Sequence, residues 1–449
     1  MSISKEELKK QVTQEIENNK DKLINFSKDI AENAETGYRE SKTSAKVKEI
    51  FKSINLGFTD GHAITGVKSE PIKGKSEGPT IAVIGELDGL IVKDHPLADP
   101  KTNAVHACGH NCQLGSMLGV GLGLINSKAN QYLNGNVVLF AVPAEETIEN
   151  EYRINLIDEG KLGFMSGKQE LIRIGSFDDI DSAMLSHATT NPEDKDLSIG
   201  GTSLGHVVKY VEFHGRASHA AGAPYAGVNA LKAANIAMMA MDLQRESFKD
   251  EDRIRVHGIL TEGGTATNSI PSIVKLEWRI RGRTIDIVNE VNEKIDRSLR
   301  AGAMAMGANV RIRSIAGNLP MLQNSEINDL YVNNANNIVG SENVKIHPDT
   351  QSGGSTDMGD LSQIMPIIHP RSGGAIGVGH GNDYFIDDYY KSVINPAKSM
   401  AMTVIDLLWP EENRLKQIIS NNVPPYSKKQ YIALQESRMG NEFSEYMKS

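Results

Sequence analysis

Hydrophobic and charged positions alternate at helical spacing along the first fifty residues. Between residues 5 and 53, hydrophobic side chains recur at helical spacing, and the predicted buried stripe consists of Leu8, Ile16, Leu23, Ile24, Phe26 and Ile30. Such a stripe is typical of amphipathic helices that pack one face against a core. The pattern therefore predicts that the chain opens with helices.

Two short hydrophobic runs, residues 80–85 and 136–142, follow this helical region. Both contain β-branched residues and are bounded by glycine, proline or charge, which is typical of strands buried on both faces of a sheet. Between them, residues 114–125 are rich in Gly, Leu and Met and predict a buried helix. Strands that alternate with helices predict an α/β domain, with a mixed sheet flanked by helices.

The pattern changes between about residues 205 and 316. Strand-like and helical segments there follow the order β-α-β-β-α-β: residues 207–213, 228–243, 254–260, 273–280, 285–306 and 309–315. This order is typical of a ferredoxin-like module. Because a strand-like segment returns at 366–368, we expect an inserted lid or dimerisation domain at 203–316. The catalytic domain would then comprise residues 1–202 and 317–449.

The composition predicts a soluble globular protein. Hydrophobic residues make up 39% and charged residues 23% of the 449 residues, which is near the globular average. The formal net charge of -9 and the lack of a basic stripe argue against a nucleic-acid partner. No segment reads as a signal peptide or membrane span, so we expect a cytoplasmic protein without a membrane partner. The charged segment after Asn413 predicts a surface helix or a partly mobile tail.

The segment His-Ala-Cys-Gly-His-Asn at 106–111 is the strongest sign of chemistry in the chain. Cys108 and His110 are two residues apart, so both side chains can reach one divalent ion from an extended or tightly turned segment. Further candidates follow strand-like or glycine-rich segments: Asp88, Glu145, Glu146, His187 and His380. Functional residues gather at the C-terminal ends of strands in α/β sheets, so the pattern indicates a metallohydrolase.

Other interpretations of these residues stay open at this point. Cys108, Cys112, His106 and His110 could form one structural zinc knot in a binding protein, but structural zinc usually takes two separated ligand pairs. A disulfide between the two cysteines is disfavoured in a reducing compartment. His369 competes with His380 for the last ligand position. The chain could also be an inactive metal-binding or scaffold protein, because a fold does not prove activity.

Several motifs together resemble the dinuclear metal-dependent amidohydrolases. They are HACGHN at 106–111, VPAEE at 142–146, LSHA at 185–188 and GRASHAA at 215–221. That family includes hydrolases of auxin, hippurate and aminobenzoyl-glutamate conjugates, and is more distantly related to carboxypeptidase G. The resemblance extends from about Ile24 to about Leu408. Asn111, where many members have Asp, resembles the aminobenzoyl-glutamate hydrolase-like branch, and so does the segment around Asp357.

The resemblance implies two divalent metal ions per chain, Mn or Zn. The implied ligands are Cys108, His110, Glu146, His187 and His380, with Cys108 as the bridge. Glu145 would be the general base that activates a shared water. Asp88 would orient the site from behind, and His106 would lie outside the ligand set.

The resemblance also implies roles for the inserted domain and the substrate. His219 would stabilise the oxyanion in a neighbouring subunit's active site, which implies a homodimer. Asn268 and Arg281 would grip a substrate carboxylate, with Arg279 or Arg283 as alternatives to Arg281. The expected reaction is hydrolysis of the amide bond in small N-acyl or N-aminoacyl amino acids, such as aminobenzoyl-glutamate-like conjugates or dipeptides. N-deacetylation of a small amino acid derivative is the alternative.

Overall fold

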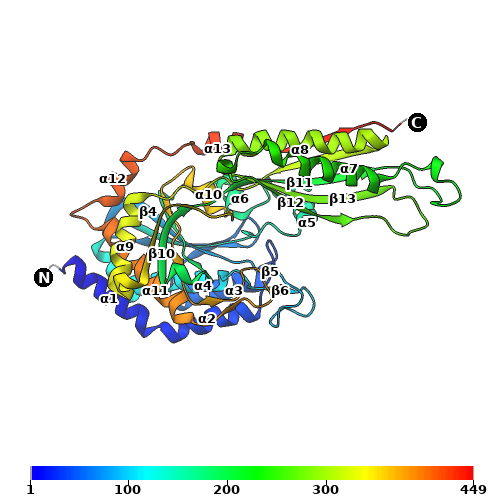
Figure 1. Cartoon of the computed structure of the whole chain (residues 1–449). Helices are drawn as coiled ribbons and strands as arrows, with labels where there is room; N and C mark the ends of the chain where they lie inside the picture. The colour runs from blue at the N-terminus through cyan, green and yellow to red at the C-terminus, as the bar shows by residue number, and fades with distance from the viewer. Residues whose placement is uncertain (1–2, 448–449) are drawn as a thin grey trace. The chain divides into compact units, whose positions relative to one another are not determined.

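The computed structural model describes residues 3–447 and separates into two compact units, whose elements are labelled in Figure 1. Unit 1 comprises Met1–Thr202, Leu322–Thr350 and Asp360–Ser427, and unit 2 comprises Ser203–Met321, Gln351–Gly359 and Lys428–Ser449. The expected inserted domain, 203–316, falls within unit 2. Unit 2 additionally includes three segments that the sequence placed in the catalytic domain: 317–321, 351–359 and 428–449.

Unit 1 contains a mixed sheet that is seven-stranded within the described residues, with the order β1-β2-β7-β4-β8-β16 and with β3 also pairing with β7. The strands are β1 Phe58–His62, β2 Gly66–Ser69, β3 Ile72–Lys73, β4 Ser76–Glu86, β7 Asn134–Val142, β8 Ser182–Met184 and β16 Ile367–Ile368. Strands β7, β4, β8 and β16 run parallel, whereas β1, β2 and β3 add antiparallel pairs. The two predicted buried runs form β4 and β7, the central pair that leads to the site.

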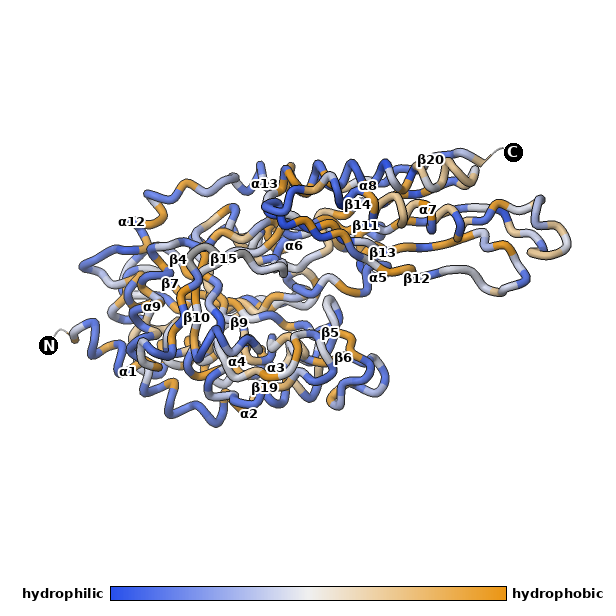
Figure 2. The backbone as a smooth tube through the Cα atoms, in the orientation of Figure 1, coloured by the Kyte–Doolittle hydropathy of each residue, from blue (hydrophilic) through white to orange (hydrophobic). Residues whose placement is uncertain are grey.

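The helices of unit 1 are α1 Lys5–Asn18, α2 Lys20–Glu32, α3 Ser41–Ser53, α4 His110–Asn126, α5 Asn150–Asp158, α6 Gly167–Arg173, α9 Ser325–Val339, α11 Asn395–Leu408 and α12 Arg414–Asn421. Helix α10 Met358–Ser362 begins in unit 2 and ends in unit 1. The almost wholly buried α4 packs against β4 and against α1, α2 and α11. The predicted stripe on α1 and α2 is buried except for Ile24, which is only partly buried. Much of the opposite side of α2 is hydrophilic in Figure 2.

Unit 1 also contains smaller sheets. A four-stranded sheet of the described residues has the order β15-β10-β17-β9, formed by β9 His187–Ala188, β10 Leu197–Thr202, β15 Val344–Gln351 and β17 Arg371–Ser372. Two short pairs join β5 Leu90–Ile91 to β6 Ala104–Val105, and β18 Ala375–Ile376 to β19 Phe385–Ile386. Strand β9 itself begins with His187, and the loop between β18 and β19 carries His380.

Unit 2 is an antiparallel sheet with the order β12-β13-β11-β14-β20. Its strands are β11 Gly205–His214, β12 Arg255–Glu262, β13 Ile273–Gly282, β14 Asn309–Ala316 and β20 Gly440–Ser444. Helices α7 Ala230–Leu243 and α8 Ile285–Met306 pack on each other and on the hydrophobic side of the strands. Figure 2 shows hydrophobic stretches along β11 and β13. The first six elements occur in the predicted order β-α-β-β-α-β.

The C-terminal segment forms helix α13 Lys428–Ser437 and then the edge strand β20. The sequence predicted a surface helix or mobile tail here and did not predict the strand, because Gly-Asn-Glu-Phe-Ser lacks a hydrophobic run. The guanidinium of Arg438, which is buried, donates to the carbonyl oxygens of Gly317 and His206. These contacts fasten the tail to the ends of β14 and β11. Among the described residues, no helix is long and hydrophobic enough to cross a membrane.

Candidate metal centre

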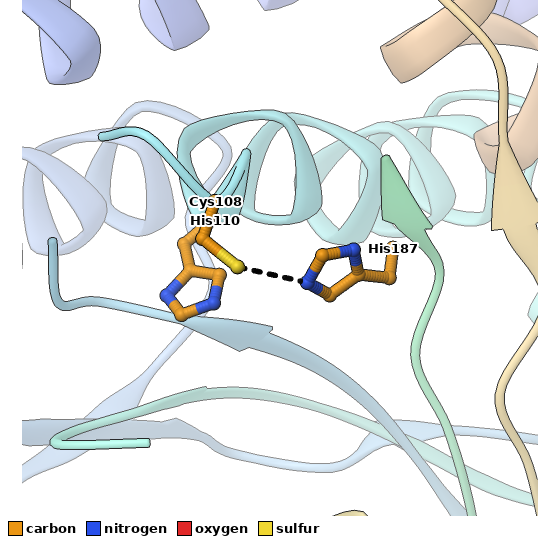
Figure 3. A group of neighbouring side chains, drawn as sticks. All are labelled: Cys108, His110 and His187. Atoms are coloured by element: carbon orange, nitrogen blue, oxygen red, sulfur yellow. Dashed lines mark hydrogen bonds between the residues drawn. The ribbon is translucent and has the colours of Figure 1, made fainter. Parts of the chain in front are cut away.

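Cys108 belongs to two groups of potential metal ligands in unit 1. Ligand atoms of Cys108, His110 and His187 lie within 4.8 Å of one another, and the same holds for Cys108, Glu146 and His380. Figure 3 shows the Cys108 sulfur between the rings of His110 and His187. The structure thus brings all five sequence-predicted ligands together. The Cys108 sulfur is common to both groups, and sulfur, imidazole and carboxylate donors together fit a divalent metal ion.

A glycine turn presents Cys108 and His110 to the same site. Gly109, between them, has a φ of 83°, a left-handed conformation that glycine adopts readily. A Cβ at this position would lie 2.6 Å from the Tyr384 hydroxyl oxygen and 2.9 Å from the Ala188 Cβ. His110 then begins α4 directly. The turn therefore requires glycine both for its backbone conformation and for its close packing.

Backbone carbonyl groups orient two of the histidine rings. His110 Nδ1 lies 2.8 Å from the Asp88 carbonyl oxygen, and His187 Nδ1 lies 2.7 Å from the Ala188 carbonyl oxygen. A carbonyl oxygen only accepts, so each Nδ1 carries a proton and each Nε2 is the nitrogen left for a metal. His187 Nε2 lies 3.3 Å from Cys108 Sγ. This arrangement matches that of imidazoles held in place as metal ligands.

The charges around Cys108 favour its thiolate form. Burial and the nearby Glu146 carboxylate raise the pKa of the Cys108 thiol, but His187 and His110 outweigh them and lower it to about 6. The thiolate is the form that binds metals. Burial lowers the pKa of His110, but Glu86 and the Cys108 thiolate raise it well above its ordinary value. Metal binding would therefore displace protons from the imidazoles.

Glu146 and His380 form the other side of the centre. Glu146 Oε1 lies 3.3 Å from His380 Nε2. Burial raises the pKa of Glu146, but the His380 contact outweighs it and lowers that pKa to about 2. The backbone amide of His380 donates to the Ala107 carbonyl oxygen at 2.9 Å, which ties its loop to the residue before Cys108. The His380 side chain is 56% exposed, so this side of the centre is accessible.

The competing ligands lie outside both groups. The His369 ring stacks on His187, with 5.9 Å between ring centroids, and burial lowers the pKa of His369 to about 3. Burial also lowers the pKa of His106 to about 3, and raises that of the Cys112 thiol. Neither His106 nor Cys112 belongs to a group of ligand atoms within 4.8 Å among the described residues. The geometry therefore favours His380 over His369 and disfavours a zinc knot.

Asp88 holds the two adjacent glutamates from behind. Its fully buried carboxylate accepts hydrogen bonds from the backbone amides of Glu145 at 3.1 Å and Glu146 at 2.9 Å. The Glu145 carboxylate forms a third group with Glu86 and His110, again with ligand atoms within 4.8 Å. Glu145 is thus next to the metal-ligand candidates, and Asp88 holds its backbone amide.

A buried polar cluster beside His110 was not predicted from the sequence. Glu86 Oε1 lies 2.5 Å from Lys168 Nζ, and Glu86 Oε2 accepts from Gln113 Nε2 at 2.9 Å. Burial raises the pKa of Glu86, but Lys168 and His110 outweigh it and hold that pKa far below its ordinary range. Glu86 ends a hydrophobic strand two residues before Asp88, and this position could have marked it as a candidate site residue. Nothing in the sequence marked Lys168 as a site residue, because it lies in a short helix far along the chain from Glu86.

The predicted residues of the inserted domain lie in unit 2. His219 and Asn268 are on adjoining loops, since the amide next to His219, that of Ala220, donates to the Asn268 carbonyl oxygen at 2.9 Å. His219 Nδ1 accepts from the amides of Ala221 and Gly222, so the proton of a neutral ring is on Nε2. Arg281 lies on β13 and donates to Ser355 Oγ at 2.8 Å. Arg279 and Arg283 are on or just beyond the same strand, and Asp357 is buried.

Comparison with known proteins identifies the family. Residues 82–405 match the peptidase family M20/M25/M40. The chain belongs to this family. M20 membership confirms the resemblance predicted from the motifs and makes the protein a hydrolase of amide bonds.

Individual relatives of this M20 chain differ in what they act on. It is 30% identical over 319 residues to the human Xaa-Arg dipeptidase, an alignment that covers 68% of this chain and 67% of the relative. It is 24% identical over 306 residues to a p-aminobenzoyl-glutamate hydrolase subunit of Escherichia coli, and this alignment covers 66% of this chain and 58% of the relative. A Bacillus subtilis structure described as a dinuclear metal binding M20 peptidase shares the fold, with a TM-score of 0.62 and 19% identity. The match covers 86% of this chain and 98% of that structure's chain.

Proposed function

We propose that this M20 protein hydrolyses small N-acyl or N-aminoacyl amino acids at a centre for two divalent ions, Zn or Mn. The observation that carries the proposal is Cys108, whose sulfur is common to both ligand groups. One group would use His110 and His187, and the other Glu146 and His380. The oriented imidazoles and the depressed thiol pKa of Cys108 fit this role. When bound, such ions would polarise the amide carbonyl and acidify a water molecule.

The chain's own residues would move the protons. Glu145 would accept a proton from the attacking water and deliver it to the leaving nitrogen. Asp88 keeps Glu145 in place, because its carboxylate accepts a hydrogen bond from the Glu145 backbone amide. The Nε2–H of His219, whose Nδ1 accepts hydrogen bonds from two backbone amides, is a suitable hydrogen-bond donor for the oxyanion that develops in a neighbouring subunit's active site. These assignments give each predicted catalytic residue one task.

The substrate proposed for this centre carries a free carboxylate. The guanidinium of Arg281 offers a fork that binds a carboxylate in a bidentate manner, and the amide of Asn268 offers a further donor. The related Xaa-Arg dipeptidase and p-aminobenzoyl-glutamate hydrolase support conjugates of amino acids as the substrate class. Dipeptides and aminobenzoyl-glutamate-like conjugates are therefore the first compounds to test.

Hydrolysis should depend on metal and on the class of substrate. We expect protein loaded with Mn or Zn to release free amino acid from at least one acyl-amino acid, dipeptide or aminobenzoyl-glutamate substrate, and chelation followed by reloading to abolish and restore the release. Chromatographic quantification of the amino acid is the measurement. Release that continues at the same rate after complete removal of the metal would contradict the proposal.

We propose further that the protein is a homodimer joined through unit 2. Strand β12 is an edge of the described sheet and exposes Ile259 (62%), and α7 exposes Met239 (65%) and Leu243 (75%). Unpaired edges with exposed hydrophobic residues are sites of strand pairing between chains. Ile259→Lys should shift the dimer toward monomer in sedimentation velocity, whereas Val423→Lys, an exposed position in unit 1, should not. A wild-type protein that sediments as a monomer at every concentration would refute the dimer.

A further inference from the structure

The turn that carries Glu145 and Glu146 has a backbone conformation that needs support. Ala144, directly before Glu145, has a φ of 54°. This left-handed region is disfavoured for residues with a side chain, because Cβ crowds the following carbonyl oxygen. Such a conformation persists only where surrounding contacts hold it. The contacts that hold Ala144 therefore affect the orientation of the neighbouring Glu145 and Glu146 side chains.

Two buried acidic side chains, Glu40 and Asp88, accept hydrogen bonds from three consecutive amides of this turn. Glu40 Oε1 accepts from the Ala144 amide at 2.9 Å, and Asp88 accepts from the next two amides. On the carbonyl side, the buried guanidinium of Arg153 donates to the Ala144 carbonyl oxygen at 3.3 Å and to the Glu146 carbonyl oxygen. Glu40 is thus the side chain that binds the amide of the left-handed residue itself.

Glu40 is itself fixed in place, 104 residues before Ala144 in the chain. Its side chain is fully buried, and Thr65 Oγ1 donates to its second oxygen, Oε2, at 2.6 Å. The same loop packs closely on the turn, since a Cβ at Gly37 would lie 2.9 Å from Ala144 Cα. Burial, then the nearby Asp88, raises the pKa of Glu40 to about 8. A neutral side chain of the same shape should therefore serve at this position.

We propose that Glu40 is a positioning residue for the Glu145–Glu146 pair. Its hydrogen bond to the Ala144 amide fixes the left-handed turn, and the turn aims Glu145 as base and Glu146 as ligand. Glu40 acts through the backbone and contacts neither metal nor substrate. The inference rests on the proposed function for its effect on catalysis, and on the geometry alone for its effect on the turn.

The test compares Glu40→Ala with Glu40→Gln by two readouts. In Glu40→Ala, the amides of residues 144–146 should exchange hydrogen faster, and kcat should fall by about 10- to 100-fold, as expected for a small misplacement of catalytic groups. KM should change by less than about twofold, because no substrate contact is removed. Glu40→Gln keeps an acceptor for Ala144 and a partner for Thr65, so it should restore slow exchange and nearly all of kcat.

Glu35→Ala is the matched control. Glu35 also accepts hydrogen bonds from backbone amides, those of Lys42 at 2.8 Å and Thr43 at 2.9 Å, but its bonds are local to α3. This variant should leave exchange at 144–146 and kcat unchanged. If Glu40→Ala does not fold, Thr65→Val removes only the anchor of Glu40 and should move both readouts in the same direction by less.

Two outcomes would overturn the role of Glu40. One is a folded Glu40→Ala variant with wild-type kcat and wild-type exchange at 144–146. The other is a Glu40→Gln variant as impaired as Glu40→Ala, which would mean that the hydrogen bond to Ala144 is not what matters. If the wild-type protein hydrolyses no substrate in the panel, the proposed function fails, and the exchange comparison still decides whether Glu40 holds the turn.

Discussion

Replacing Glu145 with glutamine should lower kcat by about 10²- to 10⁴-fold, the range that proton transfer by a positioned side chain contributes. Glutamine has nearly the same shape, but it cannot accept a proton from the attacking water. The Asp88 carboxylate binds the backbone amide of residue 145, so the turn should keep its geometry in the variant. We therefore expect KM and the metal content to stay near wild type, as steady-state kinetics and metal analysis would show.

Glu151→Gln is the control for the loss of a negative charge near this turn. Glu151 is exposed on α5, six residues after Glu145, and belongs to no candidate ligand group among the described residues. Its replacement should leave kcat unchanged. A Glu145→Gln enzyme with at least about a third of wild-type kcat would rule Glu145 out as the base, because proton transfer by a catalytic group is worth far more.

Replacing Cys108 with alanine should greatly weaken metal binding. Both ligand groups use the Cys108 sulfur, so its removal leaves His110 with His187 on one side and Glu146 with His380 on the other. Loss of a mere supporting contact to a ligand already costs about 10- to 100-fold in metal affinity or activity. We expect the affinity for both ions to fall by more than this, measured by titration with a chelator of known affinity.

Cys112→Ala is the matched control for Cys108→Ala. Cys112 is buried in α4, four residues further on, and belongs to neither ligand group. Its replacement should cost about 1 kcal/mol of stability, like many core substitutions, and should leave the metal affinity unchanged. If the two cysteine variants bound metal equally well, Cys108 would not be a bridging ligand.

The local parts of the fold could be predicted from the sequence. The runs at 80–85 and 136–142 form β4 and β7, and the buried helix expected at 114–125 is the greater part of α4. Each of these segments carries its own hydrophobic pattern. Strand β20 does not carry such a pattern, because Gly440–Ser444 has no hydrophobic run. It forms a strand by pairing with β14. Strand pairing between distant segments leaves no periodic signal in either one.

The same distinction applies to the site. Cys108, Glu145 and Glu146 lie in motifs whose residue types and spacing point to metal chemistry. Lys168 and Glu40 do not, because their roles come from burial against Glu86 and Ala144, which are far from them in sequence. A single charged residue in a helix or loop is usually a solvated surface position. Only the three-dimensional contacts show that Lys168 is buried beside Glu86 and that Glu40 is buried beside the turn at Ala144.

The number of ions bound per chain tests the two-metal account most directly. Native mass spectrometry or equilibrium dialysis with zinc or manganese should find two ions per wild-type chain, and fewer in Glu146→Ala, since Glu146 is a ligand candidate in one group only. A wild-type chain that binds one ion, and keeps it when Glu146 is replaced, would contradict the dinuclear centre.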